Sequence, residues 1–241
     1  MNQRINIKIK VFRAIDEPDL CTKYLRAHRE VLSIYYGITQ ITSDNPGWPD
    51  NPEVYVITAE SAFDHELLCG IRVNKVGGTQ PLPVEVAIGK LDSGIYDLVK
   101  KYAANGAGEL CGLWNSRKVA GKGLSFLLTR MGISILNQLG INTMFGICAE
   151  LTLPMFQGVG FEIEESLGNK GAFHYPKSDL LAFSLIMKDP INLDKASTVE
   201  REKIFKLRKI LKENVFETGP KGELYIEYDL SIPKSWIKNE V

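Results

Sequence analysis

Hydrophobic and polar residues alternate from Ile5 to Phe12, where isoleucines and valine are separated by polar side chains. A period of two is typical of a strand with one buried and one exposed face. The segment Asp16-Glu17-Pro18 follows, and acidic residues with a proline suit the first turn of a helix. The pattern therefore predicts a strand followed by a helix in this part of the chain.

Two further apolar segments, Glu53–Glu60 and Leu67–Val76, predict consecutive strands joined by a polar turn near Asp64-His65. A second helix is expected from Leu91 to Ala104. This order indicates strands that meander in antiparallel fashion before the middle of the chain.

The segment Glu109–Trp114 predicts the next strand. Large apolar residues then recur at helical spacing from Leu124 to Ile135, and Gly140 is expected to end that helix. Ile141–Cys148 is almost continuously apolar, as in a strand buried on both faces. A strand, a helix and a second strand in this order predict a right-handed crossover between two parallel strands.

Shorter elements follow this unit. A short helix is expected over Glu150–Val159, and strands over Gly160–Glu165 and Leu180–Met187. After Asp189-Pro190 the composition shifts, which marks the start of a C-terminal extension.

The extension is predicted to hold a helix over Val199–Lys212 and, after a turn at Gly219–Gly222, a strand over Glu223–Leu230. Basic residues on the helix are interleaved with glutamates, which is typical of a solvated face. A docking face for another protein is the alternative. The basic residues are Arg201, Lys203, Lys206, Arg208, Lys209 and Lys212.

Composition and charge exclude several classes of protein. The 241 residues include 29 basic and 29 acidic side chains, so the chain has no electrostatic footprint for nucleic acid or an anionic membrane. No apolar run approaches the ~20 residues of a membrane-spanning helix. The cysteines form no C-x-x-C pair, so we expect buried thiols in a cytoplasmic protein and no metal site. They are Cys21, Cys69, Cys111 and Cys148.

The connection from Lys118 to Leu124 is the chemically most informative segment. It carries Gly121 and Gly123 between a predicted strand and a predicted helix. Glycines allow the backbone to approach a ligand closely, and a helix N-terminus presents N–H groups to an anion. A P-loop is excluded because Gly121-Lys122 is followed by glycine instead of serine or threonine. We interpret the segment as a pyrophosphate site.

Two motifs in this order resemble the GNAT superfamily of acyl-CoA N-acyltransferases. The pyrophosphate loop of that family, (Gln/Arg)-x-x-Gly-x-(Gly/Ala), is similar to Lys118-x-x-Gly121-x-Gly123. An aromatic-x-x-x-Gly-Phe pattern on a short helix is similar to the segment from Phe156 to Gly160-Phe161. The motifs cover Glu109 to Phe161, and the order of elements extends the resemblance from Ile5 to Met187.

The resemblance implies an α/β (α+β) fold with a mixed, mostly antiparallel central sheet, a splayed parallel strand pair and flanking helices. It assigns residues 1–190 to a GNAT-like domain and residues 191–241 to a helix–strand extension packed on the same domain. The larger branch that makes N-acyl amino acids or acyl-homoserine lactones also begins with an Arg-bearing strand, like Val11-Phe12-Arg13. That branch also carries a glutamate on the central strand.

The resemblance further implies coenzyme A or acyl-CoA as cosubstrate. In the family, the backbone after the central strand holds the pantetheine arm between the splayed strands. Those contacts fall on Leu113, Trp114 and Asn115, although Trp114 is equally well explained as a core residue. The residues that would wrap the pyrophosphate are Lys118, Val119, Ala120, Gly121, Lys122, Gly123 and Leu124.

Two positions depart from the family pattern. Lys118 replaces Gln or Arg, which keeps a cation and loses the planar fork of arginine. Phe156 occupies the place where many members carry a tyrosine that protonates the departing thiolate. Phenylalanine donates no proton, so either another group acts as the acid or the thiolate leaves unaided.

Four residues are candidates for proton transfer, and each also has a purely structural explanation. Glu109 opens the central strand and suits the base that deprotonates the amine; a solvated strand-end glutamate is the alternative. His174 and Tyr175 are candidate acid or acceptor contacts, or residues of a surface loop. Glu85 is a candidate base or substrate anchor, although the exposed face of an edge strand explains it better.

The resemblance therefore predicts a transferase that moves an acyl group from acyl-CoA, or from an acyl carrier protein, to the amine of a small molecule. A non-catalytic acyl-CoA-binding or sensing domain on the same fold is the alternative, because the tyrosine is missing. A structural or interaction protein with an incidental glycine turn is a third. Acceptor identity, acyl length and a homodimeric assembly stay open at this level.

Overall fold

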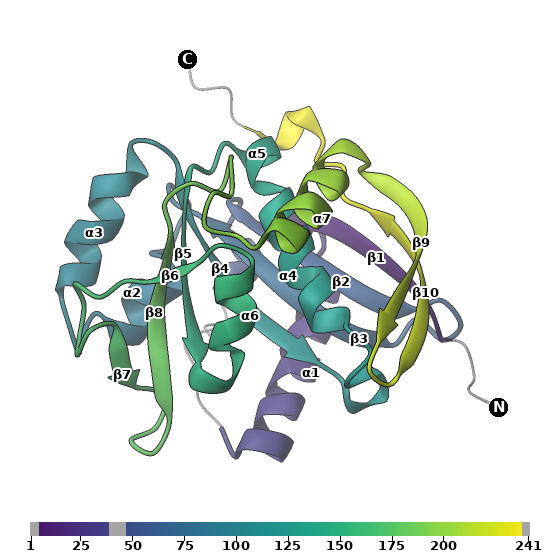
Figure 1. Cartoon of the computed structure of the whole chain (residues 1–241), viewed down its shortest axis with the longest axis horizontal. Helices are drawn as coiled ribbons and strands as arrows, with labels where there is room; N and C mark the ends of the chain where they lie inside the picture. The colour runs from purple at the N-terminus through teal and green to yellow at the C-terminus, as the bar shows by residue number, and fades with distance from the viewer. Residues whose placement is uncertain (1–4, 39–46, 238–241) are drawn as a thin grey trace.

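In the described part of the chain, ten strands form a single mixed sheet (Figure 1). The computed structural model describes residues 5–38 and 47–237. The strand order is β6-β8-β5-β4-β3-β2-β1-β10-β9, and β7 pairs with β8 off this path. The strands are β1 Ile5–Arg13, β2 Val54–Ser61, β3 Leu67–Lys75, β4 Ala107–Asn115, β5 Thr143–Ala149, β6 Glu162–Ile163, β7 Ala172–His174, β8 Leu181–Met187, β9 Lys212–Gly219 and β10 Gly222–Asp229.

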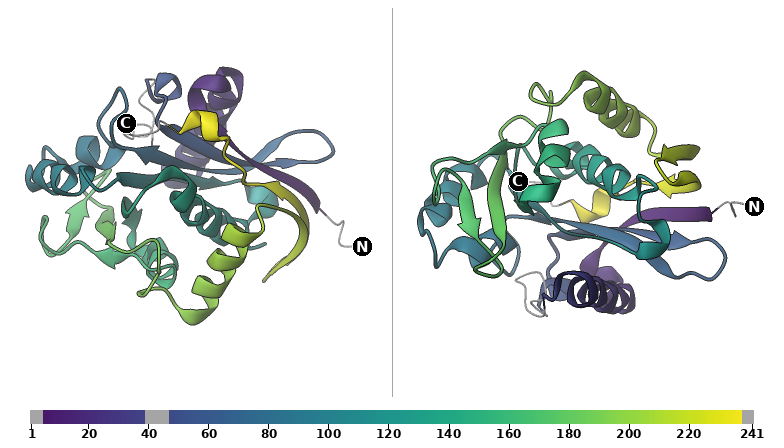
Figure 2. Two further views of the ribbon diagram at one scale, coloured as in Figure 1. Left: turned by 90° about the horizontal axis from the view of Figure 1, so that it is seen from above. Right: turned by 60° about the horizontal axis from the view of Figure 1, so that its bottom comes forward.

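Helices cover both faces of the sheet. Figure 2 shows α1 on one side and α4 with α7 on the other. The helices are α1 Pro18–Tyr36, α2 Pro83–Ile88, α3 Gly94–Ala103, α4 Leu124–Ser134, α5 Leu136–Leu139, α6 Leu153–Gly158 and α7 Thr198–Lys209. Within the described residues, no helix is long and apolar enough to cross a membrane.

The predicted parallel strand pair is present and short. β4 pairs with β5 in parallel only over Ala107–Glu109, whose partners are Thr143 to Phe145. Beyond this point β4 stays paired with β3, and β5 stays paired with β8. The two strands therefore splay apart after Glu109, as expected for this fold class.

The apolar patterns seen in the sequence build the core. The helical stripe of α4 packs against β2, β3 and β4 in the largest cluster, which also contains the alternating isoleucines Ile7 and Ile9 of β1. A second cluster joins α2 and α3 to the other face of the sheet, and a third packs Tyr24 of α1 against Trp48 and Trp114. The sheet is thus buried on both faces where β4 and β5 diverge.

The C-terminal extension belongs to the same sheet and core. β10 lies parallel to β1, and β9 forms the sheet edge beyond it. α7 packs on α4, where Arg130 and Glu200 form a largely buried ion pair with a 2.8 Å hydrogen bond. The predicted helix over Val199–Lys212 ends earlier, at Lys209, because the chain continues as β9, a strand that the sequence analysis did not foresee.

The expectation for Glu85 is wrong. Pro83–Ile88 forms the short helix α2 instead of an edge strand, and proline occupies its first turn. The Glu85 carboxylate accepts a 2.7 Å hydrogen bond from the backbone N–H of Leu82. Glu85 is therefore half-buried at the start of a helix and not on an exposed strand face.

Candidate active site at the splay of the central strands

Glu109 occupies the last position at which β4 and β5 are paired, opposite Phe145. The side chain is fully buried, so it is not the solvated strand-end glutamate that was the alternative. Its Oε2 accepts a 2.6 Å hydrogen bond from the backbone N–H of Val84 in α2. Its Oε1 is buried and has no hydrogen-bond partner among the residues that the structure describes.

Burial raises the pKa of Glu109 to about 8 from its ordinary value of 4.5, because an apolar environment disfavours the charged form. The Val84 N–H and the positive charge of Arg72 act in the opposite direction, and the carboxylate of Glu85 adds to the rise. A carboxyl with this pKa exchanges a proton near neutral pH. That property is what a general base or acid requires.

Polar side chains of the neighbouring strand β3 lie near this carboxyl, on the face of the sheet opposite α4. Asn74 lies directly across from Glu109 in the β3–β4 register, and Arg72 lies across from Cys111. The guanidinium of Arg72 is fully buried, and its Cζ lies 4.2 Å from the centroid of the Trp48 ring. Polar side chains at core positions of a sheet are uncommon and point to a functional site.

A small cavity of about 10 Å³ lies beside Arg72 and Asn74, and Glu109 is not among the residues that line it. That volume is of the order of one water molecule. The sequence analysis missed Arg72 and Asn74, although a charged residue within the apolar run Leu67–Val76 was an available signal. The cavity is lined by Trp48, Arg72, Asn74, Gln80, Pro81, Pro83 and Val86.

A bulge redirects β4 between Cys111 and Trp114, shortly after Glu109. The β3–β4 register shifts between Gly70 and Arg72, and Gly112 has a φ of +64°, which only glycine adopts readily. The hydroxyl of Tyr24 donates a hydrogen bond to the Gly112 carbonyl. An added Cβ on Gly112 would lie 2.8 Å from that hydroxyl, so the close packing also requires glycine.

The splay leaves one edge of β4 without a strand partner. In the described registers β5 pairs only with Ala107–Glu109, so residues 110–115 present backbone groups toward the gap. Leu113 packs against the α4 cluster, and Asn115 Oδ1 is buried with no hydrogen-bond partner in the described part of the chain. Such an edge suits an extended ligand with amide groups.

The glycine turn has the predicted form. Gly121 and Gly123 have φ values of +76° and +84°, and Gly123 immediately precedes α4. Val119 and Leu124 are buried and fix the two ends of the turn in the core, while Ala120 is partly exposed between them. The first N–H groups of α4 have no acceptor within the helix, so the turn and helix together suit a phosphate group.

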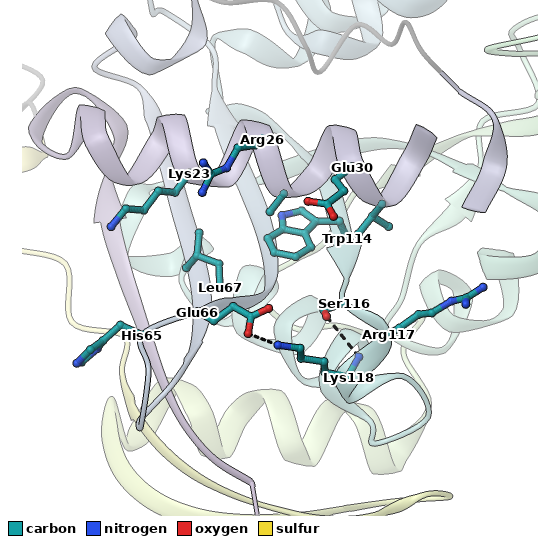
Figure 3. A pocket seen from close by; sticks show the side chains of 12 residues that line it. Lys23, Arg26, Glu30, His65, Glu66, Leu67, Trp114, Ser116, Arg117 and Lys118 are labelled. Atoms are coloured by element: carbon teal, nitrogen blue, oxygen red, sulfur yellow. Dashed lines mark hydrogen bonds and ion pairs between the residues drawn. The ribbon is translucent and has the colours of Figure 1, made fainter. Parts of the chain in front are cut away.

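The side chains of Trp114 and Lys118 point away from this turn (Figure 3). Trp114 is 3% exposed and packs edge-on against Tyr24 with ring centroids 5.9 Å apart, as a core residue does. Lys118 pairs with Glu66 across a cavity of about 460 Å³ between α1 and the segment that follows β4. At these two positions only the backbone remains available to a ligand in the gap.

The structure does not bring His174 to Glu109. β7 pairs with β8 opposite Leu181, whereas Glu109 lies at the level of Ile186, with β5 and β8 between. At about 3.3 Å per residue and about 4.8 Å per strand, the two side chains are roughly 20 Å apart. His174 is exposed, while Tyr175 packs on the cluster that contains Val84.

Phe156 is a core residue. It is 6% exposed and packs edge-on against Phe161, with ring centroids 5.6 Å apart. The second sequence motif therefore marks the packing of α6 on the sheet. Among the described residues, no group of three or more His, Cys, Asp or Glu side chains has a metal-binding arrangement.

No protein-family model matches the chain, and no curated protein matches it in sequence. Solved structures do match. FeeM, an N-acyl amino acid synthase from uncultured soil microbes, aligns with a TM-score of 0.59 at 13% identity, covering 81% of this chain and 97% of its own. BjaI, a CoA-dependent acyl-homoserine lactone synthase with SAM and isopentyl-CoA, aligns at 0.53 and 10% identity, covering 95% and 97%.

Escherichia coli ElaA aligns with a TM-score of 0.52 at 10% identity, covering 75% of this chain and 99% of its own. Likeness at these identities concerns the fold. The order of elements, the splayed β4–β5 pair and the glycine turn before α4 agree with it. The chain therefore has the GNAT fold.

Proposed function

We propose that the protein transfers an acyl group from an acyl-CoA thioester to the amine of a small molecule. The observation that carries the proposal is Glu109, buried where β4 and β5 diverge, with a pKa of about 8 and one oxygen without a partner. An amine is protonated in water at neutral pH and must lose a proton to attack a carbonyl. A carboxylate held at this position suits that task.

The residues present fit the donor. The Gly121–Leu124 turn and the first N–H groups of α4 suit the diphosphate. The unpartnered edge of β4 at Leu113, Trp114 and Asn115 suits the amides of the pantetheine arm, which would lead the thioester toward Glu109. CoA supplies the activated acyl group as its thioester, and the backbone of this chain binds and orients it.

The proton steps follow from the geometry. Glu109 in its ionised form takes a proton from the ammonium group at Oε1, directly or through one bridging water. The nitrogen lone pair then forms a bond to the thioester carbon, and collapse of the tetrahedral adduct breaks the carbon–sulfur bond. The nitrogen gives its remaining extra proton to solvent, and Glu109 releases its own proton to solvent after the step. No tyrosine stands at Phe156, and a thiolate with a pKa of ~8–9 leaves without an acid and takes its proton from solvent.

A thiol-release assay tests the proposal. The full chain is incubated with short-, medium- and long-chain acyl-CoA and a broad panel of primary amines that includes amino acids. We expect thiol release that depends on an amine and yields an N-acyl product by mass spectrometry. Gly121→Val is expected to abolish CoA binding in calorimetry, because a branched side chain blocks the turn at a φ of +76°.

Gly140→Val is the matched control. Gly140 also has a positive φ, +65°, but has open space around it and lies at the far end of the α4–α5 helix pair. Gly140→Val should lose about as much stability as Gly121→Val and should keep the CoA affinity of the wild type. Equal CoA affinities of the wild type and Gly121→Val would overturn the donor assignment.

A non-catalytic acyl-CoA-binding domain is the second candidate, and the buried Phe156 in the tyrosine position favours it. CoA binding without amine-dependent thiol release at every chain length would support the sensor. An acyl carrier protein in place of CoA is the finer alternative for the donor. The same assay with an acylated carrier protein separates the two donors.

A further inference from the structure

The tip of the C-terminal β9–β10 hairpin lies directly on the glycine turn (Figure 1). The backbone N–H of Lys221 donates a 2.9 Å hydrogen bond to the carbonyl of Gly121. In return, Nζ of Lys122 donates a 3.0 Å hydrogen bond to the carbonyl of Lys221. Two segments about a hundred residues apart therefore share one small surface.

Gly219 permits this approach. A Cβ on Gly219 would lie 2.3 Å from the carbonyl carbon of Lys122 and 2.7 Å from the backbone nitrogen of Gly123. Both are main-chain atoms of the turn and cannot rotate aside. The φ of Gly219 is not in the left-handed region, so the need for glycine at this position comes from space and not from backbone angle.

The hairpin also carries a positive charge to the turn. The stem of Lys221 runs over Gly121, with its Cδ 2.8 Å from the position of a Cβ on that glycine. Within residues 5–38 and 47–237, neither Lys122 nor Lys221 forms an ion pair with an acidic side chain. The two ammonium groups thus remain available for an anion at the turn.

We propose that the β9–β10 turn is part of the donor-binding site, with Gly219 as a positioning residue and Lys221 as a direct phosphate contact. The inference rests on the proposed function, since it takes the ligand to be the diphosphate-bearing part of CoA. Gly219 keeps the backbone N–H groups of the turn aligned by allowing the hairpin to pack against it. Lys221 adds a charge that the Lys118 side chain, paired with Glu66, does not supply.

Isothermal titration of CoA into the full chain tests both residues. Gly219→Ala should raise the Kd about tenfold, the loss expected when a hydrogen bond to a charged group is misaligned. Lys221→Met should raise it about threefold, the effect of one exposed charge, and the difference should shrink at high salt. Lys209→Met, which removes an exposed lysine on α7, should match the wild type.

A kinetic readout separates this role from general stability. In thiol release, both variants should raise the KM for acyl-CoA and leave kcat at saturation unchanged. If Gly219→Ala does not fold, as judged by circular dichroism, Lys221→Met carries the test. If Gly219→Ala and Lys221→Met bind CoA with wild-type affinity while Gly121→Val does not bind it, this inference is overturned and the proposed function is not. No CoA binding by the wild type would overturn the proposed function and this inference with it.

Discussion

The backbone N–H of Val84 donates a 2.6 Å hydrogen bond to Oε2 of Glu109, across 25 positions of sequence and from a different element. The contact ties a carboxyl group on β4 to the first turn of α2. Because Oε2 already accepts a hydrogen, the proton of the neutral acid resides on Oε1. That oxygen has no partner among the described residues, and under the proposed function it is the atom that exchanges the proton.

Glu109→Gln is predicted to lower amine-dependent acyl transfer by about 100-fold at pH 8, the usual range for loss of a general base. The wild-type rate should rise with pH through about 8, where the pKa of Glu109 lies, and then level off. The variant should lack that rise, because glutamine does not ionise. The measurement is initial thiol release between pH 6 and pH 9.5.

The acceptor in this measurement should be an aliphatic amine that stays largely protonated throughout the range, because only an ammonium group needs the base. Its own titration then enters the profiles of all the proteins equally. Asn74→Asp serves as a second variant, because a carboxylate opposite Glu109 in the register disfavours ionisation of Glu109. It should move the rise to higher pH. Profiles of the same shape and height in all three proteins would remove Glu109 from the reaction.

The same burial predicts a pH-dependent stability. The pKa of Glu109 in the folded chain, about 8, lies above its ordinary value of 4.5, so between these values the folded state binds a proton that the unfolded state has lost. The free energy of unfolding therefore falls as pH rises through this window, by several kcal/mol. Below it the stabilisation is complete, and above it the buried charge opposes folding.

Urea unfolding of the wild type and Glu109→Gln at pH 5, 6.5 and 8 isolates this effect. The difference between the two curves is the quantity to compare, because other groups titrate equally in both proteins. We expect the free energy of unfolding of Glu109→Gln, relative to that of the wild type, to increase steadily from pH 5 to pH 8. A constant difference would mean that Glu109 is ionised throughout the range.

The ion pair of Arg130 and Glu200 is predicted to hold α7 on α4. The side chains are only 8% and 16% exposed, and the bond to Arg130 lowers the pKa of Glu200. Glu200→Ala should reduce the free energy of unfolding by about 3 kcal/mol, because it leaves a buried guanidinium without its carboxylate. Replacing both residues with methionine should recover most of that loss.

Asp194→Ala is the control for this experiment, since it breaks an exposed ion pair between Asp194 and Arg201. The side chain of Arg201 is 43% exposed and that of Asp194 is 67% exposed. It should change stability by about 0.5 kcal/mol or less. Chemical denaturation at pH 7 compares the variants. Equal losses in Glu200→Ala and Asp194→Ala would show that the first pair contributes no more than a surface pair.

The cysteines are predicted to react slowly in the native protein. All four are free thiols, three of them buried and Cys111 half-buried. Burial raises the pKa of Cys21, Cys111 and Cys148 to about 12 and that of Cys69 further, so the reactive thiolate is scarce at neutral pH. Labelling with a chromogenic disulfide should be slow before urea and reach four thiols after it. A fast-reacting native thiol would contradict this, and it would also raise the background of the thiol-release assay.

Patterns that are local in sequence predicted most of the architecture. The alternation from Ile5 to Phe12 became β1, and the strand, glycine turn, helix and strand around Gly121 became β4, α4 and β5. Periodicity over two or more turns, or over a whole strand, reflects which face must be buried, so it can be read before the fold is known. The positive φ of Gly121 and Gly123 follows from the same local chemistry.

Short and peripheral elements were harder to predict from the sequence. The six residues of α2 are too few to show a helical period, and an edge strand was the preferred explanation for Glu85. β9 alternates between exposed and half-buried positions at the edge of the sheet, where few apolar residues mark it. Such elements exist because tertiary contacts stabilise them.

The sequence by itself determined that Glu109, the glycine turn and the two parallel strands belong to one unit, because their spacing along the chain makes them neighbours. Only the tertiary structure decided that Glu109 is buried, bonded to Val84 and faced by Asn74, and that His174 lies elsewhere. It also decided that Gly219 and Lys221 reach the glycine turn. Burial, ionisation and contacts between distant segments depend on strand order and register, which arise from the packing of the whole chain.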